Sequence, residues 1–359
     1  MPRGKPKFSK KEAEELEARV LADFDLYAPE KLKIQTMEGK LESFNLNTPQ
    51  KILGQIIRLV RIVILKARRE GISTYTEGRF YWHTSLKANR YAVCITHDPQ
   101  TTDFLFKMTK RYYDNISEKE RPKTKFNRSD LLEFAGLDSA FRVATASKTD
   151  FASGQLVHYA HFSEVAKWPS EKQTSLLNSL LPCIPPDEDT EIIFESTAKG
   201  IGGEFYTRYW ACRYRYEVVL KDGKSAIKMS INKDAHASNA YSSIFFPWFV
   251  FPKYYKKAPK EFKKTKEEKE LAVLYGVNDG QLNWRRDAIE NICKGSVTIF
   301  HQEFPSYPME AFLSSGRPVF DVKKILLWIK ESKPAQINYE CQLSTGQWVA
   351  SAEGALKVW

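Results

Sequence analysis

The stretch Arg61–Thr74 reads RIVILKARREGIST and decides the fold, since it joins an apolar run to a basic turn and a helical pattern. The apolar run predicts a short buried strand, and the helical pattern continues from Ser73 to Leu86. Backbone N–H groups and the helix dipole at such a junction attract an anion, and neighbouring cations neutralise it. The stretch therefore predicts a phosphate-binding loop between a strand and a helix.

The loop departs from the usual pattern G-x-x-x-x-G-K-[ST] in the place of its cation. Gly71 and Ser73 supply the second glycine and the hydroxyl. Ile72 stands where the lysine belongs, and Lys66 stands where the first glycine belongs. We expect Lys66 and Arg69 to hold the β- and γ-phosphates in place of the missing lysine. A basic strand-to-helix turn without a ligand is the alternative that the loop alone leaves open.

The size and charge of the chain narrow its class. It has 359 residues, enough for two domains or one domain with a lobe, and a formal net charge of +11. This charge favours acidic partners, nucleic acid first, although solubility also explains it. The five scattered cysteines indicate neither a disulfide framework nor a zinc site. No apolar run approaches a membrane span, and the polar N-terminus is not a signal peptide.

Apolar segments alternate with helical patterns along the chain. Before the loop, the sequence predicts a helix over 9–24, a hairpin over 32–46 and a helix opening at 47–50. The strand candidates after the loop are 91–96, 141–146, 155–162, 190–194 and 242–249. This alternation indicates a three-layer α/β core with a mainly parallel sheet. Helical patterns over 253–271 and 283–293 predict a smaller, mostly helical lobe, and one more helix is expected over 322–331.

Two further motifs follow predicted strands, as the loop does. Glu164 follows the candidate 155–162, where a carboxylate can polarise a water for attack on a γ-phosphate; a helix-capping role is the alternative. The hydroxyls of Ser196 and Thr197 follow 190–194 and suit sensing of the γ-phosphate; a tight polar turn is the alternative. Since ligands of parallel sheets sit at the carboxyl ends of strands, the three motifs predict one site.

Gln50, at the start of the helix before the loop strand, is a candidate for binding the base of the nucleotide. Its amide offers a donor and an acceptor that match the edge of adenine. A solvent-exposed glutamine at a helix start is the alternative.

The order and spacing of these motifs resemble the large terminase subunit of tailed bacteriophages and prophages. The matching segments lie within roughly residues 28–325 and are Phe44–Gln50, Lys66–Thr74, His161–Trp168, Glu195–Gly200, Phe246–Phe249, Gln302–Pro305 and Glu310–Phe312. The resemblance implies a P-loop ATPase core of the ASCE type, with Glu164 activating water, Ser196, Thr197 and Ala198 coupling hydrolysis to movement, and Ser73 binding Mg²⁺. The ATP-binding residues that it implies are Gln50, Lys66, Ala67, Arg68, Arg69, Glu70, Gly71, Ile72, Ser73 and Thr74.

The same resemblance implies a motor that threads double-stranded DNA into a procapsid. Its partners would be the portal protein, the small terminase subunit and further copies of the chain in a ring. It would work in the host cytoplasm, docked transiently on the procapsid and absent from the virion, with no membrane partner. The expected parts are a helix and hairpin arm over 1–45, the ATPase core over 46–250, a helical lid over 251–320 and a connector over 321–359.

The chain departs from the family in three places. Ser163 stands where the family has an aspartate for Mg²⁺. The segment 150–154 lacks the arginine that reaches a neighbour's ATP, so that only Arg142 suggests itself for this role. The chain stops about where a nuclease domain would begin, so we expect no nuclease activity. A helicase-like ATPase that remodels nucleic acid, and a non-catalytic module that docks on DNA or the capsid, are the alternative functions.

Overall fold

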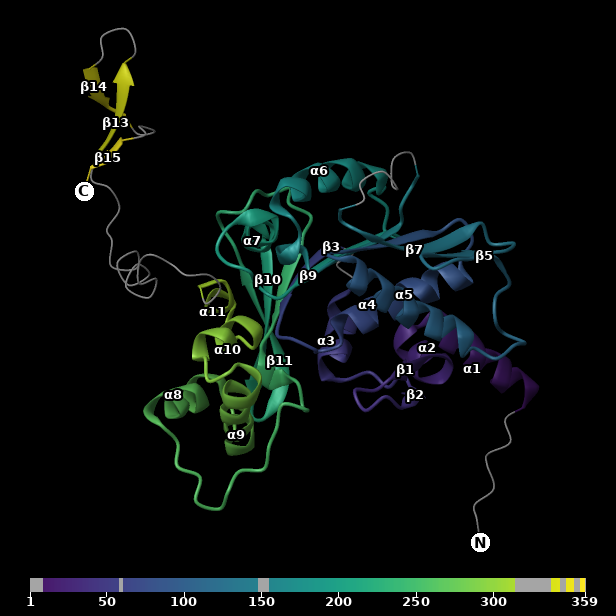
Figure 1. Ribbon diagram of the computed structural model, residues 1–359. Coiled ribbons are helices and arrows are strands. Elements are labelled where there is room, and N and C mark those ends of the chain that lie inside the picture. Colours follow the sequence, from purple (N-terminus) through teal and green to yellow (C-terminus); the bar gives the residue numbers. More distant parts are fainter. Residues whose placement is uncertain are drawn as a thin grey trace. The chain divides into compact units, whose positions relative to one another are not determined.

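The chain divides into two compact units, Met1–Ser315 and Gly316–Trp359, which are described separately. The computed structural model describes residues 9–57, 61–147, 155–313, 337–342, 347–351 and 356–358 (Figure 1). The expected helix over 322–331 lies outside the described residues. The four expected parts, with boundaries at 45, 250 and 320, stay predictions.

A ten-stranded sheet forms the centre of the larger unit (Figure 1). The strand order is β11-β10-β12-β3-β9-β8-β4-β7-β6-β5, and the strands from β10 to β7 in this order run parallel. Antiparallel strands form both edges. The bounds are β3 Arg61–Lys66, β4 Tyr91–Thr96, β5 Thr124–Asn127, β6 Leu131–Phe134, β7 Ser139–Thr145, β8 Tyr159–Ser163, β9 Glu191–Ser196, β10 Tyr214–Lys221, β11 Lys224–Ile231 and β12 Ser242–Phe246.

The strands predicted after the loop are all present, with two changes in length. The strand expected over 155–162 begins only at Tyr159. The strand expected over 242–249 ends at Phe246, because Pro247 has no N–H to continue the ladder and leads into the short helix η4, Trp248–Val250. The edge strands β5, β6, β10 and β11 were not among the predicted strands.

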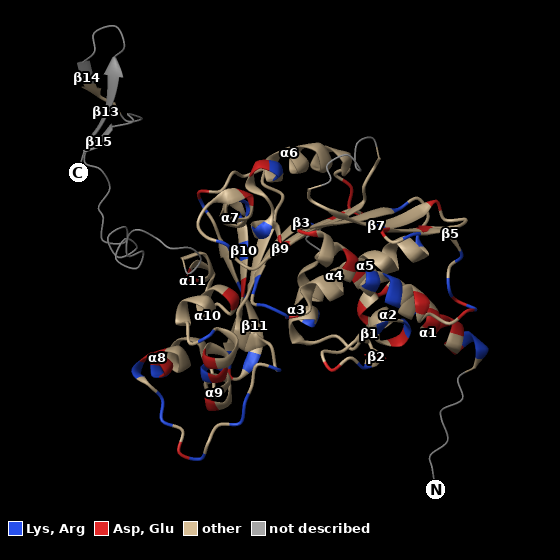
Figure 2. Ribbon diagram, viewed as in Figure 1, with Lys and Arg blue, Asp and Glu red and all other residues tan. Residues whose placement is uncertain are grey.

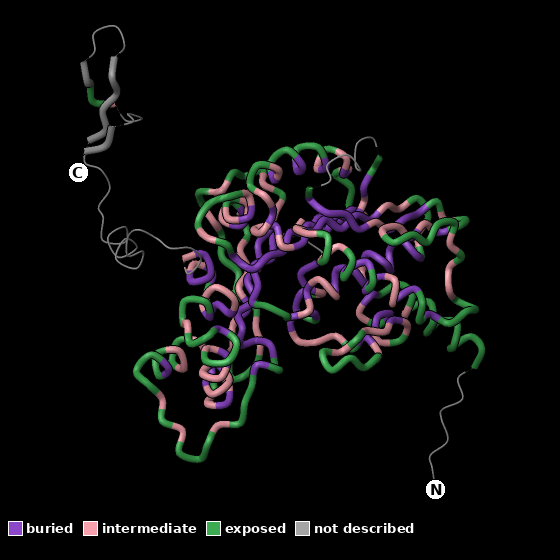
Figure 3. The backbone as a smooth tube through the Cα atoms, viewed as in Figure 1, coloured by how far each residue is buried: buried purple, intermediate pink, exposed green. Residues whose placement is uncertain are grey.

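Helices cover both faces of the sheet and make the predicted three-layer core. In β3, Ile62 and Ile64 face one apolar core, whereas Val63 and Leu65 face the other. The first core lies under α2 Phe24–Lys31, α3 Thr48–Ile56, α4 Ile72–Leu86 and α5 Pro99–Asp114. The second lies under α6 Ser170–Leu180 and α7 Gly203–Ala211, with the short helices η2 Val165–Lys167 and η3 Leu181–Cys183 nearby in sequence. Figure 3 shows the central strands buried between these layers.

The N-terminal part follows the predicted pattern. Helix α1, Lys10–Ala22, begins at a capping box in which Ser9 and Glu12 bond each other's backbone N–H. The hairpin consists of β1, Lys33–Gln35, and β2, Leu41–Ser43. A second capping box, between Asn47 and Gln50, starts α3 directly before the loop strand.

The helical lobe follows β12. It contains α8 Lys266–Tyr275, α9 Asp279–Asp287, the π-helix η5 Ala288–Ile292, α10 Val297–Glu303 and α11 Pro308–Leu313. The expected helix over 253–271 is wrong in its first half, because Pro259 interrupts it and Thr265 caps the helix that follows. Stacked rings join the lobe to the core, with the ring centroids of Trp248 and Trp284 5.3 Å apart.

The smaller unit is a three-stranded antiparallel sheet in the order β14-β13-β15. Its strands are β13 Ile337–Gln342, β14 Gln347–Ala350 and β15 Leu356–Val358. None of the helices in the described parts of the chain is long and apolar enough to cross a membrane.

Candidate functional site

The predicted strand, loop and helix are present. Strand β3 ends at Lys66, and α4 begins at Ile72 after a turn in which Arg69 and Gly71 both have left-handed backbones, with φ of 55° and 80°. A Cβ on Gly71 would lie 2.7 Å from Nε2 of Gln50, so that no larger residue fits this position. The tight turn brings the first N–H groups of α4 next to the end of β3.

Gln50 is buried and holds the loop in place. Its Nε2 donates to the carbonyl oxygen of Gly71 over 2.8 Å, and its Oε1 accepts from the backbone N–H of Asn47 over 2.9 Å. Asn47 in turn donates from Nδ2 to the carbonyl oxygen of Glu70 over 3.0 Å. Both halves of the Gln50 amide are therefore occupied, and pairing with adenine would exchange these hydrogen bonds for new ones.

Lys66 lies between two carboxylates at the carboxyl end of the sheet. Its Nζ is 3.3 Å from Oε1 of Glu164 and 3.7 Å from Oε2 of Glu195, and its side chain is only 6% exposed. Burial lowers the pKa of Lys66, but the carboxylates of Glu195 and Glu164 outweigh burial and raise that pKa above its usual value. Lys66 therefore carries its charge at neutral pH.

Glu164 is held from the opposite side by the end of β9. Its Oε2 accepts from the backbone N–H of Thr197 over 3.3 Å, and from the hydroxyls of Thr197 and Ser196 over 3.4 Å each. Burial raises the pKa of Glu164, but Lys66 and Lys167 bring it below its usual value, so the group is an anion at neutral pH. Loop, glutamate and hydroxyls thus converge, since β3, β9 and β8 are neighbours in the sheet.

Glu195 lies within the same cluster, although the sequence gives it no role of its own. Its Oε1 accepts from the hydroxyl of Ser73 over 2.5 Å and from the hydroxyl of Ser163 over 3.1 Å. Burial raises the pKa of Glu195, but Lys66 and His161 lower it to about 2. Its position depends on the register between β8 and β9, in which Ser163 lies opposite Glu195, and a single strand's pattern does not reveal that register.

Behind Glu195, a buried group of Glu77, Cys94 and His161 has the residue types of a metal site. His161 Nδ1 lies 2.6 Å from Oε1 of Glu77, nearer than the separation of about 3.3 Å that two ligands at 2.0–2.1 Å make around a tetrahedral ion. Burial lowers the pKa of His161, but Glu195 and Glu77 raise it to about 9. The imidazole is therefore a cation that pairs with two carboxylates rather than a ligand.

The other loop residues lie in different surroundings. Arg68 is half-exposed, and its Nε is 3.2 Å from Oε2 of Glu303 in the helical lobe. Arg69 is exposed, and Ala67 and Ile72 are buried, whereas Thr74 is half-buried. Glu70 is fully buried, and neither carboxylate oxygen has a hydrogen-bond partner among the described residues. Of the basic residues in the loop, Lys66 is the one that reaches Glu164 and Glu195.

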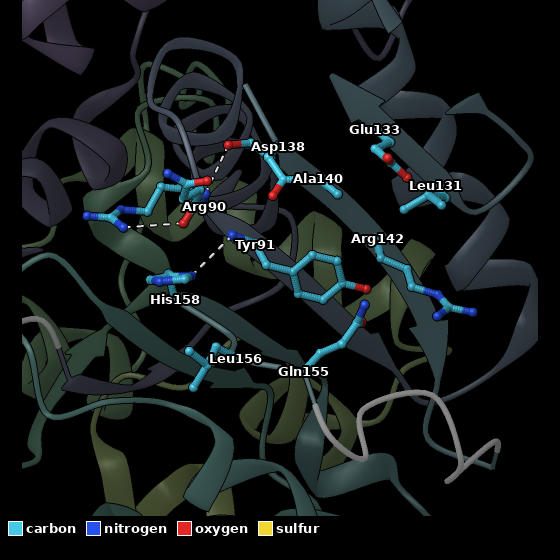
Figure 4. A pocket seen from close by; sticks show the side chains of 12 residues that line it. Arg90, Tyr91, Leu131, Glu133, Asp138, Ala140, Arg142, Gln155, Leu156 and His158 are labelled. Carbon is cyan, nitrogen blue, oxygen red and sulfur yellow. Dashed lines mark hydrogen bonds between the residues drawn. The ribbon is translucent and has the colours of Figure 1, made fainter. Parts of the chain in front are cut away.

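Two pockets lie away from this cluster. Figure 4 shows the first, of about 430 Å³, lined by Arg90, Arg142 and His158 at the amino ends of β4, β7 and β8. It is at the opposite edge of the sheet from the loop, where nucleotides do not usually bind. Arg142 lies 3.5 Å from Asp130 there. The second pocket, of about 590 Å³, follows the flank of α3 and is lined by Thr48 and Lys51 among others.

Comparisons with known proteins place this fold. No protein-family model matches the chain, and no curated protein matches it. The large terminase of bacteriophage HK97 matches with a TM-score of 0.51 and 12% identity, over 92% of this chain and 67% of that one. The ATPase domain of the Thermus phage P74-26 large terminase matches with a TM-score of 0.46 and 15% identity, over 72% and 91%. A large terminase of a thermophilic bacteriophage, in complex with ATP-gamma-S, matches with 0.34 and 13%, over 64% and 50%.

The match to the HK97 protein shows that the chain has the fold of a large terminase, an α/β ATPase core with a mainly parallel sheet. The resemblance predicted from the motifs is therefore confirmed at the level of the fold.

Proposed function

We propose that the chain is the ATPase motor of a viral DNA-packaging terminase, which couples ATP hydrolysis to movement of double-stranded DNA into a procapsid. One observation carries the proposal: a buried lysine, a carboxylate anion and two hydroxyls converge from three adjacent parallel strands beside a phosphate-type loop. Lys66 Nζ lies 3.3 Å from Glu164, and Glu164 in turn accepts hydrogen bonds from Ser196 and Thr197. A cation, a base and a sensor are what phosphoryl transfer to water requires.

ATP would rearrange the contacts of Lys66. The triphosphate is a stronger partner for an ammonium than one carboxylate, so binding should draw Lys66 from Glu164 to the β- and γ-phosphates. Glu164, freed of this ion pair, can accept a proton from a water that attacks the γ-phosphate. Ser196 and Thr197 contact the same carboxylate, so loss of the γ-phosphate would change their hydrogen bonds and the position of β9.

Mg²⁺ fits the oxygen ligands beside the loop. The hydroxyl of Ser73 and the carboxylate of Glu195 are hard oxygen donors, and Oε2 of Glu195 has no hydrogen-bond partner among the described residues. When bound, Mg²⁺ neutralises charge on the phosphates. The chain's own part is to hold Ser73 at the first turn of α4, where the loop presents the phosphates.

The helical lobe would transmit the change, because it contacts the loop directly. The backbone N–H of Arg68 donates to the carbonyl oxygen of Glu303 over 2.9 Å, and the Arg68 side chain pairs with the same residue. The hydroxyl of Tyr254 donates to the carbonyl oxygen of Arg68. A shift of the loop on nucleotide binding would therefore move the end of α10, which supports a lid role for the lobe.

Double-stranded DNA, the portal protein, the small terminase subunit and further copies of the chain in a ring are the proposed partners. The net charge of +11 supports binding to DNA through phosphate neutralisation. Figure 2 shows positive charge along residues 251–265, but Lys256 and Lys264 pair with Asp287 and Asp279. No single basic surface is therefore assigned to DNA.

Phosphate release from ATP, with and without DNA and portal-bearing procapsids, tests the function. We expect weak turnover alone and stimulation by procapsids, because a neighbour's arginine often completes such sites and adds about 10³–10⁵-fold. We also expect no cleavage of plasmid DNA with Mg²⁺ or Mn²⁺. Absence of ATP binding, or turnover indifferent to both DNA and procapsids, would contradict the motor function.

A further inference from the structure

Three oxygen-bearing side chains from three elements meet beside the phosphate-binding loop. Ser163, at the end of β8, lies opposite Glu195 on the adjacent strand β9 and donates to its Oε1 over 3.1 Å. Ser73, in the first turn of α4, donates to the same oxygen over 2.5 Å. Ser163 and Glu195 are buried, and Ser73 is half-buried.

This arrangement bears on the missing acid of the loop. P-loop ATPases hold Mg²⁺ with the serine or threonine of the loop and with an aspartate at the end of a neighbouring strand. Here the loop residue is present as Ser73, but Ser163 stands at the aspartate's position and carries no charge. Mg²⁺ sites use one or two carboxylates together with phosphates and retained waters. A carboxylate must therefore come from another residue if the site is to keep that charge.

Glu195 has an oxygen available for that purpose. Its Oε2 is buried and has no hydrogen-bond partner in the described parts of the chain, with Lys66 Nζ 3.7 Å away as an ion-pair partner. A buried carboxylate oxygen without a partner is costly and is satisfied by a cation or its bound water. A serine hydroxyl can also donate its proton to Glu195 while its lone pairs face a metal, so the bond from Ser73 is compatible with ligation.

We propose that Glu195 supplies the carboxylate of the Mg²⁺ site, so that the acid has moved from the end of β8 to the neighbouring strand β9. The proposal rests on the proposed ATPase function, since the metal arrives with the nucleotide. His161 is a positioning residue in this site. Its Nε2 lies 3.2 Å from Oε1 of Glu195 and its Nδ1 lies 2.6 Å from Glu77, so the imidazole orients the carboxylate from behind.

Manganese binding tests the proposal without depending on turnover. Mn²⁺ is titrated into the full chain saturated with a non-hydrolysable ATP analogue, and free Mn²⁺ is measured by electron paramagnetic resonance. We expect Glu195→Gln to weaken Mn²⁺ binding at least about tenfold, as the loss of a charge-assisted ligand does. Affinity for the analogue without metal should stay the same or rise, because a negative charge beside the phosphates is removed. A merely structural role would lower both affinities.

Moving the carboxylate back provides a rescue. In the double variant Ser163→Asp with Glu195→Gln, the acid stands at the end of β8, and we expect Mn²⁺ affinity within about threefold of the wild-type value, since the charge and the oxygen ligand are restored. Glu191→Gln is the matched control. Glu191 is a buried glutamate on the same strand, paired with Arg79 and His83 and without contact to Ser73, so its loss should lower stability but leave Mn²⁺ affinity unchanged.

Glu195→Asp covers the case in which Glu195→Gln fails to fold. It keeps the negative charge that Lys66 and His161 require and withdraws the carboxylate from Ser73 by one methylene, so Mn²⁺ affinity should fall several-fold. Unchanged Mn²⁺ affinity in a folded Glu195→Gln chain, or in Glu195→Asp if the first variant does not fold, overturns the proposal. If the wild-type chain binds no analogue with or without Mn²⁺, the ATPase function itself fails, and the two outcomes are thereby distinguished.

Discussion

Oε2 of Glu164 lies 3.3 Å from the backbone nitrogen of Thr197, which donates a hydrogen bond to it. The bond links the residue proposed to activate water to the segment proposed to report hydrolysis. A backbone donor has a fixed position at the end of β9, so that movement of the carboxylate must either break the bond or move the strand end. The geometry therefore ties the chemical step to a change in the sheet.

Glu164→Gln should abolish turnover and keep ATP binding. The amide preserves shape and can still accept from Thr197 and Ser196, but it cannot take a proton from water. A positioned base contributes roughly 10²–10⁴-fold, so turnover should fall by at least that range's lower limit. Phosphate release and binding of a fluorescent ATP analogue measure the two effects. More than about a tenth of wild-type turnover would exclude Glu164 as the base.

Lys66→Ala should weaken ATP binding or slow hydrolysis at least about tenfold, since a charge-assisted contact contributes about 1.5–3 kcal/mol. Lys167→Ala is the matched control, because Lys167 also pairs with Glu164, over 3.0 Å, but lies outside the loop. Isothermal titration with an ATP analogue compares the two variants. Equal losses in both would mean that Lys66 acts by pairing with Glu164 and not by holding phosphate.

Gln50→Ala separates two roles of one side chain. The loss of its bond to Gly71 should weaken all nucleotides about fivefold, and the loss of the adenine match should also remove a preference for ATP over GTP. Asn47→Ala removes a different anchor of the loop and should weaken both nucleotides without changing the preference. If Gln50→Ala keeps the preference for ATP, the amide holds the loop and does not recognise the base.

The parts of this site that sequence predicted are those fixed by local pattern. An apolar run followed by a polar residue marks a strand end, and parallel topology brings such ends together, so Lys66, Glu164 and Ser196 could be placed in advance. Glu195 could not, because its role depends on which strand lies beside β8 and in what register. Packing between layers decides both, and no pattern within one strand contains that information.

The missed hairpin of β10 and β11 has a different explanation. Asp222 and Gly223 both have left-handed backbones, with φ of 52° and 72°, and this dipeptide is among the strongest local signals for a two-residue hairpin turn. The strands beside it alternate weakly, since β11 is a largely exposed edge with Lys224 and Lys228 among its residues. A turn signal with poor flanking periodicity is easily missed when strands are assigned from apolar runs.

Glu70→Gln should stabilise the protein at pH 8 and have little effect near pH 4. Burial raises the pKa of Glu70 well above its usual value of 4.5, although Lys66 acts in the opposite direction. The folded chain therefore retains a proton that the unfolded chain releases above pH 4.5. Stability from this group is fully present below the unfolded pKa and is lost as pH rises toward the folded pKa.

Each unit by which the folded pKa is raised corresponds to about 1.4 kcal/mol, and 1 kcal/mol shifts the melting temperature of a large domain by about 2–4 °C. Because glutamine has no proton to lose, the melting temperature of the variant should exceed that of the wild-type chain by at least about 2 °C at pH 8. The difference should shrink toward zero as pH falls through 4.5, since wild-type Glu70 is then protonated in both states. Glu188→Gln, at an exposed position, is the control and should show no such pH-dependent difference. A pH-independent gain in Glu70→Gln would mean that the two carboxylate oxygens acquire partners in solution and that Glu70 is not held neutral by burial.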